Sequence, residues 1–362
     1  MKKAVLPILA GLLLAVCTLC ACSLGNPFPL SKPGPYDFGS KGAFSDLYKF
    51  VDTKRNDTVS IMVWYPAILP EDAESTNYNN DAQPDLSGAP YPLILSSAKV
   101  SSVFGPHLAS QGFVVVGVKS LDNYAVWDEN LFNQPLDILF ALDQVATTEL
   151  EGLEGMIDAN HAGVMGYSFD GYNTLALSGA RVDPKYYLNQ CANFNNLFPT
   201  LQEGARSNYC DLAQRWDEFE ANAGPELTVS DDGLWQPMTD ERILAVMPMA
   251  PDGAMIFSER GLAAVDRPTL MLVGTEDIEW DYYNREAIFI FENLGTPDKG
   301  FISFVGEDHY MVFRDEPLSK MKHFITAFFG YYLRGRAEYA DYFSEKFVSR
   351  RKGLFWGIYP GE

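Results

Sequence analysis

The stretch from Gly163 to Gly171, GVMGYSFDG, places a serine where it could act as a nucleophile. A short apolar run ends just before Ser168, and apolar residues at helical spacing begin at Tyr172. A strand that turns sharply into a helix pushes such a hydroxyl out above a sheet, an arrangement called a nucleophile elbow. A serine can also occupy this turn without any chemical role, and Asp170 replaces the last glycine of the pattern G-x-S-x-G. The motif by itself leaves both interpretations open.

A serine nucleophile needs a base, and histidine is the usual one. The sequence has four histidines. His309 follows the apolar run Phe301 to Val305, so we expect it at the carboxyl end of a strand. His161 precedes its strand, and His107 and His323 fall inside predicted helices, where packing or surface roles are expected. His309 is therefore the candidate base.

A carboxylate is needed to hold the imidazole in one tautomer and to stabilise its cation. Asp277 lies three residues after Gly274, which ends the apolar run Thr269 to Val273. This offset makes Asp277 the candidate acid. Three neighbouring carboxylates are close enough in sequence to be rivals: Glu276, Glu279 and Asp281.

These side chains need elements that bring them together, and apolar strands alternate with helices along most of the chain. The predicted strands are Tyr91 to Ser96, Gly112 to Val118, Ala162 to Tyr167, Ile243 to Met249, Thr269 to Val273 and Phe301 to Val305. Helices are expected from Phe104 to Gln111, from Leu131 to Thr147 and after Ser168, and an antiparallel hairpin over Asp46 to Thr53 and Thr58 to Tyr65. Buried strands interleaved with helices predict an α/β fold, a mostly parallel sheet covered on both faces.

Ligands bind at the carboxyl ends of the strands in such a sheet. Ser168, Asp277 and His309 occur in the order nucleophile, acid, histidine, each directly after a different predicted strand. This is the chain order of α/β hydrolases and differs from that of the other serine-hydrolase folds. The three positions together predict a catalytic triad.

Two segments fall outside this alternation. Residues 23–44 are rich in Gly, Pro, Ser and Lys without periodicity, and we expect a tether before a domain that spans residues 45–362. Residues 182–241 are too long for a structureless loop, so they predict a folded, partly helical insertion that lies over the strand ends as a cap.

The N-terminus has the layout of an export signal. Lys2 and Lys3 precede an apolar run from Ala4 to Val16, which is shorter than the roughly 20 residues of a spanning helix. The tetrad LCAC, residues 19–22, resembles a bacterial lipobox, although Cys20 departs from the usual small or aliphatic residue there. We therefore expect residues 1–22 to direct export to the bacterial cell envelope, with lipid attached at Cys22. A plain secreted protein is the alternative.

Beyond Cys22 only Cys191 and Cys210 remain, because Cys17 and Cys20 leave with the signal. In an oxidising exported setting they are expected to form one disulfide, closing a loop for which chain entropy gives roughly 3 kcal/mol. Two buried free thiols are the alternative.

The formal net charge of −21 limits the classes of binding partner to be expected. Such an acidic surface repels phosphate backbones, so nucleic acid is not expected as a partner. There is no HExxH, no paired Cys/His metal spacing and no GxGxxG after a strand, so the sequence indicates neither a metal nor another cofactor.

Five stretches carry a resemblance to known proteins: VWYPA from Val63, HLASQGFVVVGV from His107, GVMGYSFDGY from Gly163, PTLMLVGTED from Pro268 and GEDHYMVF from Gly306. Together they resemble the α/β-hydrolase group that contains bacterial dienelactone-hydrolase-like proteins and the secreted platelet-activating-factor acetylhydrolases. Polyester-cleaving cutinase-like enzymes are a close alternative, because the sequence pattern from Gly105 to Val116 resembles theirs. The resemblance covers most of residues 46–330, with the cap unmatched. It implies metal-independent hydrolysis of small or lipid-like esters through an acyl-enzyme.

Two backbone N–H groups are needed to stabilise the oxyanion of such a reaction. The resemblance assigns one to Phe169 and the other to the loop after the strand PLILS, where Lys99 is nominated first and Ala98 second. The chain departs from its relatives here, because Ser97 and Ala98 stand where they usually carry His-Gly.

Two other functions compete with an esterase. A peptidase or amidase on the same triad predicts a pocket with charges for a peptide terminus. A non-catalytic lipoprotein that uses the fold as a binding surface has no need of the three triad residues.

Overall fold

The computed structural model describes residues 28–40, 48–68, 82–119, 126–197, 203–277 and 282–361. The predicted signal with Cys22, and the rival carboxylates Glu279 and Asp281, lie outside these residues. In the part of the chain that is described, no helix is long and apolar enough to cross a membrane.

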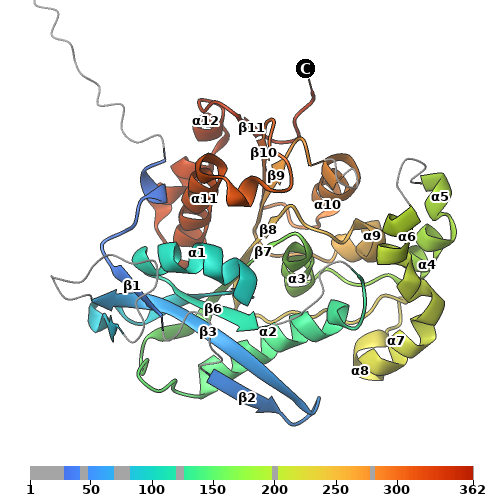
Figure 1. Cartoon of the computed structure of the whole chain (residues 1–362), viewed down its shortest axis with the longest axis horizontal. Coiled ribbons are helices and arrows are strands. Elements are labelled where there is room, and N and C mark those ends of the chain that lie inside the picture. The colour runs from blue at the N-terminus through green and yellow to red at the C-terminus, as the bar shows by residue number, and fades with distance from the viewer. Residues whose placement is uncertain are drawn as a thin grey trace, which may run out of the picture.

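One sheet lies at the centre of the molecule (Figure 1). The described strands follow the order β1-β3-β6-β5-β7-β8-β9-β10-β11, with β2 and β4 paired to β3. Neighbours from β6 to β10 are parallel, and the strands beyond them at either edge are antiparallel. The parallel strands are β5 Tyr91–Ser97, β6 Val114–Lys119, β7 Ile157–Tyr167, β8 Ile243–Met249, β9 Thr269–Gly274 and β10 Lys299–Phe304. All six predicted strands are thus confirmed.

Helices cover both faces of the sheet, as predicted. On one face α1 Ala98–Ser110 and α11 Asp315–Arg334 bury Phe104 and Phe328 against the strands. The other face carries α2 Asn130–Thr147, α3 Phe169–Leu177, α9 Ala254–Leu262 and α10 Ile288–Asn293. Strands buried on both faces cannot alternate polar and apolar residues, which is why they read as continuous apolar runs.

Helix α1 begins six residues earlier than predicted. Ser97 caps it, because its hydroxyl accepts a hydrogen bond from the Val100 N–H at 3.2 Å. The expected start at Phe104 relied on apolar spacing, and the first turn of α1 carries mostly small and polar side chains. The helix therefore begins directly at the end of β5.

The antiparallel hairpin is confirmed as β2 Tyr48–Asp52 and β3 Asp57–Ile68. The tether prediction is wrong for residues 28–40, which pack on the domain. Strand β1 Asp37–Ser40 pairs with β3, and Phe28 is 8% exposed beside the rings of His323 and Phe347. One aromatic anchor and a four-residue strand are too short to produce a sequence period, which explains why the segment read as a linker.

The insertion between α3 and β8 is largely helical, as expected. It contains α4 Pro184–Ala192, α5 Phe194–Leu197, α6 Glu203–Cys210, η3 Asp211–Arg215, α7 Trp216–Ala223 and α8 Pro225–Thr228. Cys191 and Cys210 form a disulfide of 2.08 Å that joins α4 to α6. Trp216 and Trp235 pack on each other and on the core under α2 and α3. The insertion lies beside α9 at one end of the molecule (Figure 1).

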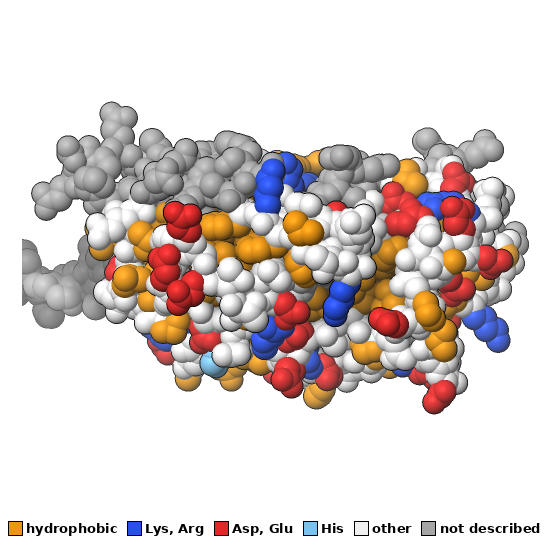
Figure 2. Space-filling view, turned by 90° about the horizontal axis from the view of Figure 1, so that it is seen from below, with side chains coloured by type: hydrophobic (Ala, Val, Ile, Leu, Met, Phe, Trp, Pro, Cys, Tyr) orange, Lys and Arg blue, Asp and Glu red, His pale blue; other side chains and the backbone are white. Residues whose placement is uncertain are grey.

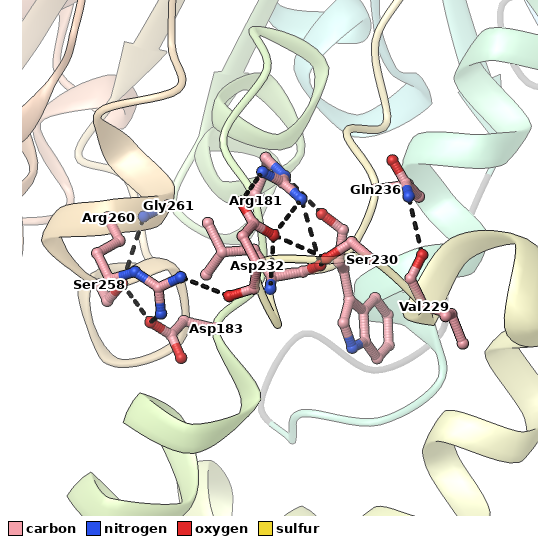
Figure 3. Close-up of polar contacts among 11 residues, drawn as sticks. Arg181, Asp183, Val229, Ser230, Asp232, Gln236, Ser258, Arg260 and Gly261 are labelled. Carbon is pink, nitrogen blue, oxygen red and sulfur yellow. Dashed lines mark hydrogen bonds and ion pairs between the residues drawn. The ribbon is translucent and has the colours of Figure 1, made fainter.

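A polar network ties the insertion to the domain (Figure 3). The Arg181 guanidinium donates to both carboxylate oxygens of Asp232, at 2.7 and 2.9 Å. Asp183 is buried at the start of α4, where it accepts hydrogen bonds from the Tyr186 N–H and from the Ser258 hydroxyl of α9, the latter at 2.9 Å. Both ends of the insertion are therefore held by charged or polar contacts.

The shorter elements complete the fold. They are η1 Pro29–Ser31, β4 Gln83–Pro84, η2 Leu86–Gly88, the π-helical turn Tyr282–Ala287, η5 Met311–Phe313, η6 Ala337–Phe343, α12 Glu345–Val348 and β11 Leu354–Trp356. On the face shown in Figure 2, acidic side chains are spread over the surface and interrupted by apolar and basic ones. The net charge of −21 is thus not gathered into a single patch on that face.

Candidate active site

Ser168 lies at the turn between β7 and α3, with φ 61° and ψ −123°. Its N–H donates to the carbonyl of Met249 at 2.9 Å, which ties the turn to β8. A Cβ on Gly166 would lie 1.8 Å from the Asp170 carbonyl oxygen, so only glycine permits this approach of strand and helix. The predicted strand, turn and helix are all present, and the turn has the sterically costly backbone of a nucleophile elbow.

The structure brings Ser168, His309 and Asp277 together. The His309 Nε2 lies 3.0 Å from the Ser168 Oγ, and the His309 Nδ1 lies 2.8 Å from the Asp277 Oδ2. A carboxylate on Nδ1 places the proton there, so Nε2 accepts from the serine hydroxyl. Asp277 is 1% exposed, whereas its neighbour Glu276 is exposed and does not take this position. A hydroxyl, imidazole and carboxylate in this order can relay a proton.

Two contacts hold the loop that carries His309. A Cβ on Gly274 would lie 2.3 Å from the Glu307 carbonyl oxygen, so glycine at the end of β9 allows the loop to approach. The Tyr167 hydroxyl donates to the His309 carbonyl at 2.6 Å. Burial raises the pKa of Tyr167, which keeps this donor protonated. Sequence reasoning missed Tyr167, and only its place beside Ser168 in the motif marks it.

A pocket of about 140 Å³ opens on Ser168 and His309. Its other described walls are mostly apolar, and they also include a cation: Val100, Val103 and Phe104 of α1, together with Tyr167, Tyr310, Val312, Phe313 and Lys99. No described residue of the insertion lines it. The expected cap therefore does not cover Ser168 within the described residues, because the insertion packs beside α2 and α9.

The two nominated oxyanion donors lie at helix starts. Phe169 is the first residue of α3, and Lys99 is the second residue of α1 and lines the pocket, whereas Ala98 does not. The N-terminal ends of two helices thus meet at Ser168. Both carry partial positive charge from the helix dipole, which favours an anion between them.

Ser97 and Asp170, at which the sequence differs from the pattern that it resembles, contact each other. The Ser97 hydroxyl donates to the Asp170 Oδ2 at 2.8 Å, and Asp170 is 2% exposed. Burial raises the pKa of Asp170 to about 6, opposed by the Ser97 hydrogen bond and by the charge of Lys99. The Asp170 carboxyl group therefore connects the starts of α3 and α1 next to Ser168.

A second buried carboxyl group lies behind the elbow. The Glu286 carboxylate accepts hydrogen bonds from the backbone N–H groups of Gly253 and Ala254, at 3.1 and 2.9 Å, at the start of α9. Burial and then the nearby charge of Asp252 raise its pKa. The Asp252 N–H in turn donates to the Ser168 carbonyl at 3.3 Å. Sequence reasoning did not single out Glu286, which lies in no motif.

The other three histidines have structural positions, as expected. His107 lies 3.0 Å from the Thr326 hydroxyl, and burial lowers its pKa to about 3. His323 stacks on Phe347 inside the core, where burial lowers its pKa to about 4. His161 pairs with Asp158 on the surface.

Comparison with known proteins gives one match to part of the chain. A family model described as PET hydrolase-like matches residues 91–194, from β5 through the elbow to the start of the insertion. No curated protein matches the chain. The matched stretch contains Lys99 and Ser168, while Asp277 and His309 lie beyond it. Together with the mostly parallel sheet between two helical layers, this match supports the α/β-hydrolase superfamily, and the chain has an α/β-hydrolase fold.

Proposed function

We propose that this protein hydrolyses carboxylic esters through an acyl-enzyme on Ser168. The observation that carries the proposal is the continuous contact from the Ser168 Oγ to the His309 Nε2 and from the His309 Nδ1 to Asp277, at 3.0 and 2.8 Å. A strand-to-helix turn that forces the serine into a sterically costly backbone conformation supports it.

The roles follow from the geometry. His309 takes the Ser168 proton as the oxygen attacks the ester carbonyl, then returns a proton to the leaving alcohol. Asp277 holds the imidazole orientation and stabilises its cation. His309 then activates water, which releases the acid from Ser168.

The oxyanion of each tetrahedral intermediate would be held by the backbone N–H groups of Phe169 and Lys99. Both residues lie in the first turn of a helix, where backbone N–H groups lack an intrahelical acceptor, and Lys99 lines the same pocket as Ser168. One such donor contributes about 3 to 4 kcal/mol of transition-state stabilisation in enzymes of this type.

The pocket supports an apolar acyl group. Its volume of about 140 Å³ is below the roughly 300 to 1,000 Å³ of pockets for drug-sized ligands, so compact acyl groups are favoured. The PET hydrolase-like match over residues 91–194 favours an ester over a peptide amide. We also propose that export and lipid attachment at Cys22 place this activity at the bacterial cell envelope.

A fluorophosphonate probe tests the proposal directly, because it reacts with activated serines. We expect it to label the mature protein and not Ser168→Ala, with Ser178→Ala as a control for a buried serine at the opposite end of the same helix. A panel of nitrophenyl esters should show the highest kcat/KM for short acyl chains, and nitroanilides should be poor substrates. Equal labelling of wild type and Ser168→Ala would show that the reactive group is not Ser168, and a wild type that is neither labelled nor hydrolyses esters would point to a binding protein.

A further inference from the structure

We infer that Asp170 and Ser97 form a buried clamp that positions the Lys99 N–H toward the oxyanion, so that Asp170 is a positioning residue for ester hydrolysis. The inference rests on the proposed function and deepens it. It assigns a role to Ser97 and Asp170, two of the three residues at which the sequence differs from the pattern that it resembles.

The clamp joins segments that are far apart in the sequence. The Ser97 hydroxyl donates to the Asp170 Oδ2 at 2.8 Å across a separation of 73 residues. Ser97 is 2% exposed and Asp170 is also 2% exposed, so water does not compete for the bond. A hydrogen bond to a buried carboxylate is among the stronger ones in proteins, and it fixes the distance between the starts of α1 and α3.

Ser97 uses the same oxygen in two directions. While it donates to Asp170, it accepts the Val100 N–H at 3.2 Å and thereby caps α1. Lys99 lies between these two fixed points, since Val100 follows it and Ser97 is two residues before it. The backbone orientation of Lys99 is therefore set by a bond whose far end is in the first turn of the nucleophile helix.

Asp170 itself is held from behind. The Asn173 amide lies 3.5 Å from the Asp170 Oδ1 and donates to the Gln134 side chain of α2. All three side chains are at most 2% exposed. The carboxylate therefore has little freedom to move, which makes it a stable reference point for Ser97.

Four variants separate positioning from simple stability. Asp170→Ala removes the acceptor, Ser97→Ala removes the donor, and Asp170→Asn and Ser97→Thr each retain a polar atom for the bond. Ser96→Ala is the matched control, because Ser96 is the adjacent buried serine on β5 and its hydroxyl donates to the Met165 carbonyl at 2.8 Å instead.

The measurement is kcat for a nitrophenyl ester, per active site titrated with the fluorophosphonate. We expect Asp170→Ala and Ser97→Ala to lower kcat by about 10- to 100-fold with little change in KM, short of the 10²- to 10³-fold loss of a whole oxyanion donor. The double variant should lose no more than Ser97→Ala alone, because Ser97→Ala already removes the bond to Asp170 together with the Val100 cap. Asp170→Asn, Ser97→Thr and Ser96→Ala should stay near wild type.

Thionoesters give a readout that a merely structural role would not change. Sulfur accepts oxyanion-hole hydrogen bonds poorly, so an intact hole favours the oxygen ester. The rate ratio of ester to thionoester should fall in Asp170→Ala and Ser97→Ala and stay unchanged in Ser96→Ala.

The outcomes are distinct. Unchanged kcat per titrated site in Ser97→Ala and Asp170→Ala, with or without a lower melting temperature, would overturn the clamp while leaving the esterase in place. A rise in kcat in Asp170→Asn would also overturn it, because it would mean that the carboxylate charge opposes the oxyanion. A wild type that neither reacts with the probe nor hydrolyses esters would overturn both proposals.

Discussion

Ser168 and Ser258 share an unusual backbone and differ in everything around it. Their φ angles are 61° and 56°, in a region that side chains other than glycine rarely adopt, at a cost of about 1–3 kcal/mol each. The Ser168 hydroxyl faces a pocket and a histidine. Ser258 lies at a kink in α9 and is 3% exposed, with its hydroxyl between Asp183 and the Gly261 N–H (Figure 3).

The comparison shows that a costly serine conformation is not by itself a sign of catalysis. At Ser258 the hydrogen bonds to Asp183 and Gly261 offset the backbone cost, and they anchor the insertion to α9. At Ser168 the described hydroxyl contact is with His309, which is itself paired with Asp277 beside a pocket. The two sites differ because Ser168 lines a pocket and contacts a histidine, whereas Ser258 is buried.

The largest expected difference is in activity. Ser168→Ala removes the nucleophile and should lower kcat for esters by about 10⁶-fold. Ser258→Ala should leave kcat unchanged, because the residue is buried away from the pocket. Steady-state hydrolysis of a short nitrophenyl ester, with each protein checked for folding by circular dichroism, measures both. Comparable losses in the two variants would remove the distinction.

The carboxylates beside the two serines should differ next. Asp277→Asn should lower kcat by about 10⁴-fold, since the amide no longer fixes the His309 tautomer. Asp183→Asn should leave kcat unchanged and reduce the free energy of unfolding by about 1–3 kcal/mol, because an NH2 donor replaces one of the two carboxylate oxygens that accept hydrogen bonds from Tyr186 and Ser258. Kinetics and urea denaturation on both variants test this pair. An Asp277→Asn enzyme with normal kcat would contradict the assigned acid.

The stability of the protein should depend on pH through Asp170, which follows Ser168 in the turn. The pKa of Asp170 rises from 3.8 to about 6 on folding, so the stability linked to its protonated form is full below pH 3.8 and is lost as the pH rises through 6. The shift corresponds to about 3 kcal/mol. The free energy of unfolding of Asp170→Asn relative to wild type should therefore increase between pH 4 and 6. A difference that stays constant with pH would show that Asp170 does not titrate in this range.

The smallest effect distinguishes the two backbones themselves. Ser168→Gly relieves the backbone strain, although glycine loses more conformational entropy on folding than serine does. The net effect should stabilise the fold by about 1 kcal/mol while abolishing activity. Ser258→Gly relieves similar strain but loses the hydroxyl contacts, so it should be neutral or destabilising. Denaturant midpoints of the two variants give the comparison. Stabilisation by Ser258→Gly as large as that by Ser168→Gly would mean that the Asp183 contact adds little.

Sequence patterns located the sheet and brought three candidate residues to one edge of it for a physical reason. Strands buried on both faces are apolar throughout, and residues just after them in a parallel sheet meet at one edge. This is why Ser168, Asp277 and His309 could be placed from their positions after the strands.

Side-chain contacts between residues far apart in the sequence produce no repeating sequence pattern. The bond from Tyr167 to the His309 carbonyl spans 142 residues, and that from Ser97 to Asp170 spans 73. Neither repeats along the chain, so only folding reveals them. The same limit explains why residues 28–40 read as a tether and why the insertion could be recognised but not placed.

The burial of Phe28 against α11 and α12 limits how far the folded domain can lie from the proposed lipid anchor. Five residues separate Cys22 from Phe28, and a fully extended chain of that length reaches about 20 Å. A lipidated Cys22 would therefore hold the body of the enzyme against the membrane by the side that carries these two helices. Substrates would then be met within a molecular diameter of the lipid surface.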